Sequence, residues 1–242
     1  MQDIYSVIFT HVTDFKTHVN FSFVSTSAYA VSHKHICTIP KAICVKLLSS
    51  NTFNKIISQF SSIGTLDLSE TKVKDASALG NCHTLDLSYT KVTDVSVLGN
   101  CHTLDLRWTS ITDVSTLGNC HTIYLRFTKL SDVSTLGYCH TLDLSNTQVT
   151  DVSALGYCHT LDLSYTKLSD VSVLGNCHTL DLRWTQVTDV SALGKCHTLD
   201  LSYTKVTDVS ALGKCHTLNL SRTNVTEIDN QKLIESGVNV IH

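Results

Sequence analysis

One block of nineteen residues recurs along most of the chain, and this repeat constrains the fold more than any other feature. A fixed period of this length is the signature of a stacked repeat architecture, because one short copy cannot bury its apolar face alone. The sequence therefore predicts a solenoid with one coil per copy. Each copy is marked by a cysteine at the same position: Cys82, Cys101, Cys120, Cys139, Cys158, Cys177, Cys196 and Cys215.

Each copy contains one short segment in which apolar and polar residues alternate. Leu85 and Leu87 follow Cys82 in this way, and a period of two is typical of a strand with one buried face. The remainder of a copy is too short for a regular crossover helix, so we expect the strands to stack in parallel at about 4.8 Å. These nine strands begin at Leu66, Leu85, Leu104, Ile123, Leu142, Leu161, Leu180, Leu199 and Leu218.

The rest of each copy must turn the chain back. We expect Asp94 to cap a tight helical turn by accepting a backbone hydrogen bond, and Gly99 to end that turn in the left-handed conformation. Thr90 can offer its hydroxyl to the backbone of the neighbouring coil. Every copy therefore has the residues for a strand, a turn and a return.

Written from its cysteine, a copy reads C-x-x-L-x-L-x-x-T-x-V, which resembles the L-x-x-L-x-L-x-x-N-x-L motif of the leucine-rich repeat family. The resemblance runs from about Ile63 to the C-terminus, with cysteine in place of the first leucine and threonine in place of the asparagine. It implies an α/β solenoid of short 19-residue repeats, with a parallel β-sheet on the concave face. In that family the concave face is the usual ligand surface.

A histidine follows each of these cysteines, which brings metal binding and nucleophilic catalysis into consideration. Consecutive side chains of an extended segment point to opposite sides, so one ion cannot take both Cys82 and His83 as ligands. A catalytic thiol needs one cleft with an oriented base, and near-identical copies offer no unique cleft. We predict no metal site, no cofactor and no enzymatic activity. We also expect acid to destabilise the solenoid, because stacked imidazolium ions about 5 Å apart repel one another.

The copies differ mainly at the two positions after the strand, where aromatic residues form two stripes with arginines beside them. Aromatic and arginine side chains are enriched in interface hot spots, which favours protein binding by the concave face. The alternative is that the rings shield the sheet while the arginines neutralise the aspartates of the strands. The predicted binding residues are Tyr89, Arg107, Trp108, Arg126, Phe127, Tyr165, Arg183, Trp184 and Tyr203.

The two stripes are themselves related. Nearly identical segments begin at Ser88 and at Ser164, four repeats apart, which indicates a block duplication. Under this interpretation the second stripe can be inherited rather than independently selected.

The segment before the repeats carries short groups of apolar residues at helical spacing. Its stretch IFTHVTDFKTHVNFSFVSTSAYAV resembles an F-box, which implies docking onto a Skp-type adaptor of a cullin-RING ubiquitin ligase while the repeats carry the substrate. The alternative is a helical cap for the solenoid. The candidate docking residues are Ile4, Val7, Ile8, Phe15, Val19, Phe23 and Val24.

These observations divide the chain into four segments. We predict an F-box-like helical module at 1–35, a connector and N-terminal cap helix at 36–62, leucine-rich repeats at 63–229 and a C-terminal cap at 230–242. Phe53, Ile56, Ile57 and Phe60 have the spacing of the cap helix. The apolar run 43–48 is expected to add a strand.

Charge and cysteine usage bear on partners and compartment. The net charge of -3 gives no basic excess to attract nucleic acid or anionic membrane, so we expect neither as a partner. Cysteines at one fixed spacing favour a reducing compartment, the cytoplasm or the nucleus. The resemblances to an F-box and to leucine-rich repeats together imply the substrate-recognition subunit of an SCF-type ubiquitin ligase, with a plain protein-binding scaffold as the alternative.

Overall fold

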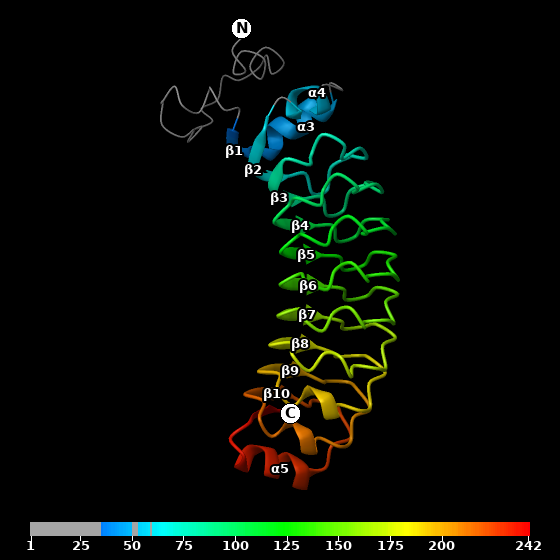
Figure 1. Ribbon diagram of the computed structural model, residues 1–242, viewed down its shortest axis with the longest axis vertical. Helices are drawn as coiled ribbons and strands as arrows, with labels where there is room; N and C mark the ends of the chain where they lie inside the picture. The colour runs from blue at the N-terminus through cyan, green and yellow to red at the C-terminus, as the bar shows by residue number, and fades with distance from the viewer. Residues whose placement is uncertain (1–34, 50–52, 59) are drawn as a thin grey trace.

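Eleven short strands stack side by side along the length of the molecule and form one parallel sheet (Figure 1). This computed structural model describes residues 35–49, 53–58 and 60–242. The order of strands in the sheet is their order in the sequence. The strands are β1 (His35–Ile39), β2 (Ser62–Asp67), β3 (Cys82–Asp86), β4 (Thr103–Asp105), β5 (Thr122–Tyr124), β6 (Thr141–Asp143), β7 (Thr160–Asp162), β8 (Thr179–Asp181), β9 (Thr198–Asp200), β10 (Thr217–Asn219) and β11 (Asn239–Ile241).

The register of the sheet follows the repeat. Leu85 pairs with Leu104, and Thr84 pairs with Thr103, so each residue lies beside its equivalent in the next copy. The sheet lines the inner side of a gently curved stack (Figure 1). The predicted solenoid of 19-residue repeats with a parallel sheet on its concave face is confirmed, and β1 and β11 extend the nine predicted strands at either end.

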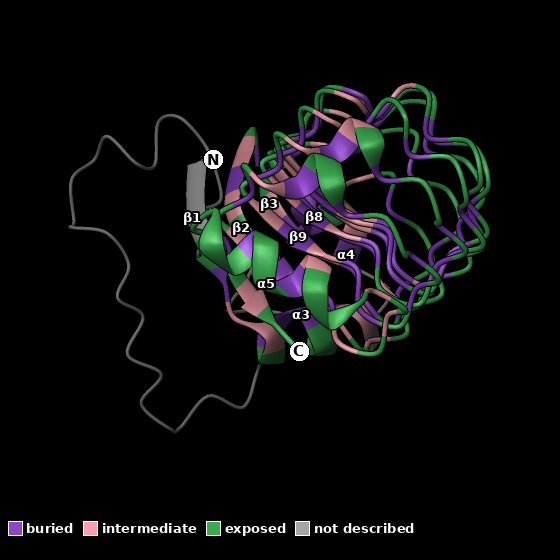
Figure 2. Ribbon diagram, turned by 90° about the horizontal axis from the view of Figure 1, so that it is seen from below, coloured by how far each residue is buried: buried purple, intermediate pink, exposed green. Residues whose placement is uncertain are grey.

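The interior of the stack is one continuous apolar core. Seen along its axis, the coils lie over one another, with buried segments inside (Figure 2). Burial of an aliphatic side chain contributes about 1.5–3 kcal/mol, and neighbouring coils supply the cover that a single coil lacks. The coil that begins at Cys82, for example, buries Cys82, Leu85, Leu87, Val92, Val95 and Leu98.

The turn of each coil is held as predicted by its aspartate but not by its glycine. The backbone N–H of Ser96 donates to Asp94 at 2.9 Å, and the equivalent bond recurs along the stack. No glycine of the array has a positive φ, however; among the described glycines only Gly237 has one. A Cβ added to Gly80 would lie 2.7 Å from the carbonyl oxygen of Val97. Glycine is needed because adjacent coils approach too closely for a side chain.

The threonine that recurs after the strand of each copy also forms a different hydrogen bond from the one expected. The hydroxyl of Thr90 donates to the carbonyl oxygen of Leu87 at 2.6 Å, which lies in its own coil rather than the neighbouring one. The equivalent bond from Thr109 to Leu106 is 2.6 Å long. The threonine therefore closes the bend within each coil.

Short helices lie at the two ends of the stack (Figure 1). Helices α3 (Lys41–Ser49) and α4 (Phe53–Ile57) lie at the N-terminal end, and α5 (Glu227–Glu235) lies at the C-terminal end. The prediction of a strand at 43–48 is wrong, because this run lies within α3. Two single turns, η1 (Ser191–Leu193) and η2 (Ser210–Leu212), lie in the coils themselves.

The F-box-like module at 1–35 falls almost entirely outside the described residues, and all seven candidate docking residues, from Ile4 to Val24, lie outside them. In the part of the chain that the structure describes, no helix is long and apolar enough to span a membrane.

Candidate binding face

A row of large side chains follows the carboxyl ends of the strands. We call this row the aromatic edge: Tyr89, Trp108, Phe127, Asn146, Tyr165, Trp184 and Tyr203. All seven residues have a positive φ, between 56° and 59°. This left-handed region is uncommon for residues other than glycine, and asparagine tolerates it better than bulky side chains do. Six of the seven positions nevertheless carry an aromatic ring.

The rings form two stacks separated by Asn146. In the first, the ring centroids of Tyr89 and Trp108 are 5.6 Å apart, and those of Trp108 and Phe127 are 3.8 Å apart. The second stack, of Tyr165, Trp184 and Tyr203, has separations of 5.8 Å and 4.2 Å. The five tyrosine and tryptophan side chains remain 45–54% exposed. Stacking thus leaves about half of each of these residues open to solvent.

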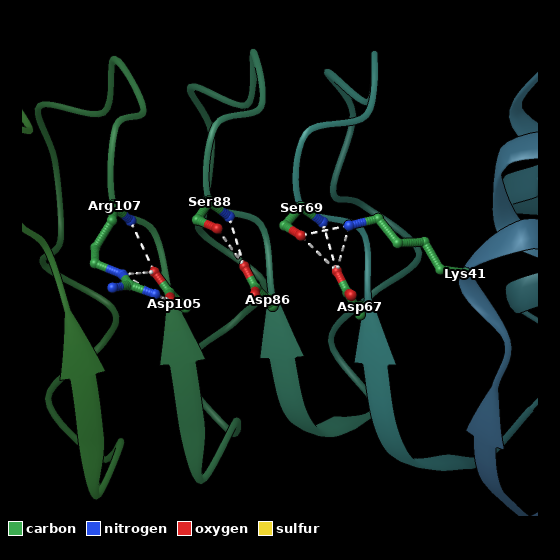
Figure 3. Close-up of polar contacts among 7 residues, drawn as sticks. All are labelled: Lys41, Asp67, Ser69, Asp86, Ser88, Asp105 and Arg107. Carbon is green, nitrogen blue, oxygen red and sulfur yellow. Dashed lines mark hydrogen bonds and ion pairs between the residues drawn. The ribbon is translucent and has the colours of Figure 1, made fainter.

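A row of carboxylates lies beside the aromatic edge, at the ends of the strands. Figure 3 shows three successive members, each bonded to the residue two positions later. Asp67 is 3.1 Å from the Nζ of Lys41, and the guanidinium of Arg107 donates to both oxygens of Asp105. We call this the aspartate row: Asp67, Asp86, Asp105, Asp143, Asp162, Asp181 and Asp200, interrupted by Tyr124.

The arginines of the two stacks are equivalent. Arg183 lies 2.7 Å from Asp181, as Arg107 lies against Asp105. Burial raises the pKa of Asp181 to about 6, and the neighbouring carboxylates Asp162 and Asp200 add to this shift, while Arg183 opposes it. Burial also raises the pKa of Asp143. The arginines therefore neutralise only part of the negative charge of the aspartate row.

The third arginine contacts a ring rather than a carboxylate. The guanidinium carbon of Arg126 lies 5.0 Å from the ring centroid of Phe127, and that of Arg107 lies 5.6 Å from the ring centroid of Tyr124. Both distances are within the range of cation–π attraction. This face therefore already holds guanidinium groups against aromatic rings.

All nine predicted binding residues lie on this face. The structure has features of both sequence-based alternatives, protein binding by this face and shielding of the sheet by the rings. The rings pack on one another and two arginines neutralise aspartates, yet the rings stay accessible. The first of the two variable positions is buried at Ser88, Ser145, Ser164 and Ser202. The sequence did not indicate the left-handed backbone of the aromatic edge, because no glycine marks it.

A second row of rings lies at the opposite ends of the same strands. We call it the histidine edge: His83, His102, His121, His140, His159, His178, His197 and His216. From His102 onward, successive ring centroids are 4.5–4.6 Å apart with interplanar angles of 8–11°. Each of these rings also lies within hydrogen-bond distance of the next residue, a threonine, as in the 3.1 Å contact of His121 with Thr122.

Two of the stacked imidazoles, those of His159 and His197, have lowered pKa values. The pKa of His159 is lowered by partial desolvation and by the neighbouring rings of His140 and His178. The pKa of His197 is lowered for the same reasons, with His216 and His178 as the neighbours.

The cysteines lie on the other side of the chain from the histidines. Cys82 and its seven equivalents are buried and carry no disulfide, whereas the histidines are exposed. Burial raises the pKa of the Cys101 thiol to about 12, so this thiol is protonated at neutral pH. The predicted divergence of Cys82 and His83 is confirmed. Among the described residues, no group of three or more histidine, cysteine or acidic side chains is placed to hold a metal ion.

No family model and no curated protein matches the sequence, but solved structures do. An internalin from Listeria monocytogenes matches with a TM-score of 0.65 and 21% identity, over 78% of this chain and 62% of its own. A leucine-rich repeat protein of Leptospira interrogans matches with a TM-score of 0.65 and 19% identity, over 78% and 57%. The chain has the leucine-rich repeat fold. It spans less than two thirds of the length of these two neighbours.

A third solved structure bears on the range of partners. The TLR13–ssRNA13 complex matches this leucine-rich repeat chain with a TM-score of 0.55 and 18% identity, over 78% of this chain and 35% of that one. A protein of this fold thus forms a complex with an RNA. The exclusion of nucleic acid, which was drawn from net charge, is not supported. The comparisons give no support to the F-box resemblance either.

Proposed function

We propose that this chain is a non-enzymatic leucine-rich repeat scaffold that binds a protein partner through its aromatic edge and aspartate row. Solenoids of this kind present extended concave surfaces for binding. The observation that carries the proposal is the left-handed backbone of the aromatic edge. That conformation favours glycine or asparagine, yet six of the seven positions of the aromatic edge carry tyrosine, tryptophan or phenylalanine.

The energetics of these positions favour a role beyond folding. A bulky residue in the left-handed region costs about 1–2 kcal/mol, whereas an aromatic pair contributes about 0.5–1.5 kcal/mol beyond its buried area. The six rings form only four stacked pairs, so stacking offsets only part of the backbone cost and yields no net stability. Exposed rings beside arginines are instead the side chains that contribute most to binding at interfaces.

The test is affinity enrichment with matched variants of the immobilised protein. The first variant is Trp108→Ala/Trp184→Ala, which opens both stacks. The control is Tyr138→Ala/Tyr157→Ala, which removes an exposed stacked pair that lies outside the aromatic edge. We expect the same partner to be enriched by the parent and the control but not by the tryptophan variant. Equal enrichment by all three proteins would refute the proposal.

A finer proposal is that the chain is the substrate receptor of an SCF-type ubiquitin ligase. Its support is the resemblance of the N-terminal segment to an F-box, in residues outside those described. The adaptor would then be a Skp-type protein bound by cullin, and the repeats would carry the substrate. If the resemblance is only superficial, the N-terminal segment is a cap for the solenoid.

Calorimetry with a purified Skp-type adaptor tests this finer proposal. We expect binding that the variant Val7→Asp/Phe23→Asp abolishes, while circular dichroism shows an intact solenoid. Absence of binding at tens of micromolar would leave the scaffold without a ligase role. The unpaired, buried cysteines of the described residues support a reducing location, the cytoplasm or the nucleus, as part of the same proposal.

A further inference from the structure

The first two rings of the two aromatic stacks have nearly the same geometry. The Tyr89–Trp108 pair has an interplanar angle of 15° at 5.6 Å, and the Tyr165–Trp184 pair has 14° at 5.8 Å. The arginine before each tryptophan pairs with the aspartate of its own strand. The duplication seen in the sequence has therefore preserved the tyrosine–tryptophan pair and its arginine. The third rings differ, with 3.8 Å and 25° for Trp108–Phe127 against 4.2 Å and 11° for Trp184–Tyr203.

Each patch also contains an aspartate, Asp86 or Asp162, that forms no direct ion pair, and the charge of each contributes to the raised pKa of the arginine in the next strand, Arg107 or Arg183. Asp86 and Asp162 are equivalent, and in both the Oδ1 atom accepts the backbone N–H of the following serine at 2.8 Å. Within the described residues, the Oδ2 atom of neither aspartate accepts a hydrogen bond. Serine stands two positions after these aspartates, where the next copy has arginine (Figure 3). One free carboxylate oxygen therefore lies beside each stack.

The charge of the whole face indicates which partner group fits there. The aspartate row has seven carboxylates, and the cations that contact it or its rings are Lys41, Arg107, Arg126 and Arg183. The face is thus acidic on balance and attracts a basic partner. Arginine suits it better than lysine, because a guanidinium can bind a carboxylate and stack on a ring at once, as Arg107 already does.

We propose that the two patches are equivalent sites for arginine side chains, and that the partner is a basic polypeptide that binds both at once. The first site consists of Asp86, Tyr89 and Trp108, and the second of Asp162, Tyr165 and Trp184. Four strand spacings separate the sites by about 19 Å. This proposal rests on the proposed function and adds to it the chemistry and the valency of the partner.

Synthetic peptides test both parts by calorimetry at low salt. The single probe is a blocked Gly-Arg-Arg-Gly peptide. The tandem probe joins two such units through twelve glycine and serine residues, whose root-mean-square span is about 19 Å. We expect two single probes to bind per protein, and one tandem probe to bind at least about 10-fold more tightly, because the second site is filled at a millimolar effective concentration.

Variants that remove one site make the test specific. Asp162→Asn/Tyr165→Ala should reduce the stoichiometry of the single probe to one and abolish the advantage of the tandem probe. The control Asp94→Asn/Tyr138→Ala makes the same change in charge and ring content away from the face, and should bind as the parent does. Circular dichroism confirms the fold of each variant.

Three outcomes would overturn the inference. The tandem probe could bind no more tightly than the single one, or the control could lose as much affinity as the site variant. A single-stranded oligouridylate could bind the face instead, which would indicate a nucleic acid partner. If the peptides fail while the tryptophan variant still loses a protein partner in the enrichment experiment, the binding face stands and only the basic chemistry is wrong.

Discussion

The histidine edge and the aromatic edge lie at opposite ends of the same strands, yet they differ in how regularly their side chains repeat. On the histidine edge the side chain is the same in all eight copies, and six successive ring pairs differ by only 0.1 Å in separation. On the aromatic edge the residue changes from copy to copy, and ring separations range from 3.8 to 5.8 Å. Uniform stacking near 4.6 Å is what strand spacing alone imposes. On the aromatic edge the ring separations depart from that spacing, because they depend on which side chain each copy carries and not on the register alone.

The core that both edges share gives the largest expected effect. Leu142 in β6 is 1% exposed, and its replacement by alanine should lower the free energy of unfolding by about 2–5 kcal/mol. Urea titration of circular dichroism measures this loss. Tyr138→Ala is the control, since that side chain is 85% exposed. A loss below about 1 kcal/mol for Leu142→Ala would mean that the coils do not depend on one another.

The aromatic edge should separate binding from stability. Loss of either Trp108 or Trp184 should weaken partner binding by about 30-fold or more, since truncation of an interface hot spot costs at least about 2 kcal/mol. The urea midpoint should change far less than it does for Leu142→Ala. Equilibrium binding of the enriched partner to each variant measures the first effect. A tryptophan variant that loses stability but not affinity would make the aromatic edge a structural feature like the histidine edge.

The features predicted correctly depend on contacts that repeat with the period of the sequence. Nineteen-residue spacing placed Leu85 beside Leu104, and alternation placed Cys82 inside and His83 outside. The strand predicted at 43–48 is the exception: Ile43, Cys44 and Leu47 lie in α3, and all three are buried. Their spacing is that of one helix face, so the sequence itself contained the signal against a strand.

The features that were missed do not follow from the repeat period or from the alternation of apolar residues. The glycine signal at Gly99 was interpreted as backbone conformation, whereas it reports the close approach of the next coil. The left-handed residues carry rings instead of glycine, so no local pattern marks them. Pairing of Arg107 with Asp105 could be foreseen only as one alternative, because a sequence does not say whether a surface arginine turns to its own strand or to a partner.

The histidine edge should make stability depend on pH. Because the pKa values of His159 and His197 are lowered, the folded state binds fewer protons than the unfolded chain. Stability should therefore fall as pH drops through the ordinary histidine range near 6.5. Asp181 acts in the opposite sense, because its pKa is raised to about 6 and its protonation favours the folded state as pH falls below that value.

Thermal melts between pH 7.5 and 5.5 measure the balance of these effects. A variant with His140, His159 and His178 replaced by glutamine should lose less of its melting temperature over this range than the parent does. Parallel melting curves for the two proteins would show that the histidine edge does not set the acid response.

The smallest predicted effect comes from a substitution that tests the left-handed backbone at a position without a ring. Glu70 occupies the equivalent left-handed position one copy before Tyr89, with φ of 58° and no ring. Glu70→Gly should raise the free energy of unfolding by roughly 0.5–1 kcal/mol, because relief of about 1–2 kcal/mol of strain exceeds the entropy cost of glycine. Lys72→Gly, two residues later at an ordinary φ, should instead lower it by up to about 1 kcal/mol. Urea titrations that show a loss for both variants would mean that the left-handed backbone is not strained. The aromatic residues would then stand at these positions without a backbone cost, and retention for binding would have no energetic basis.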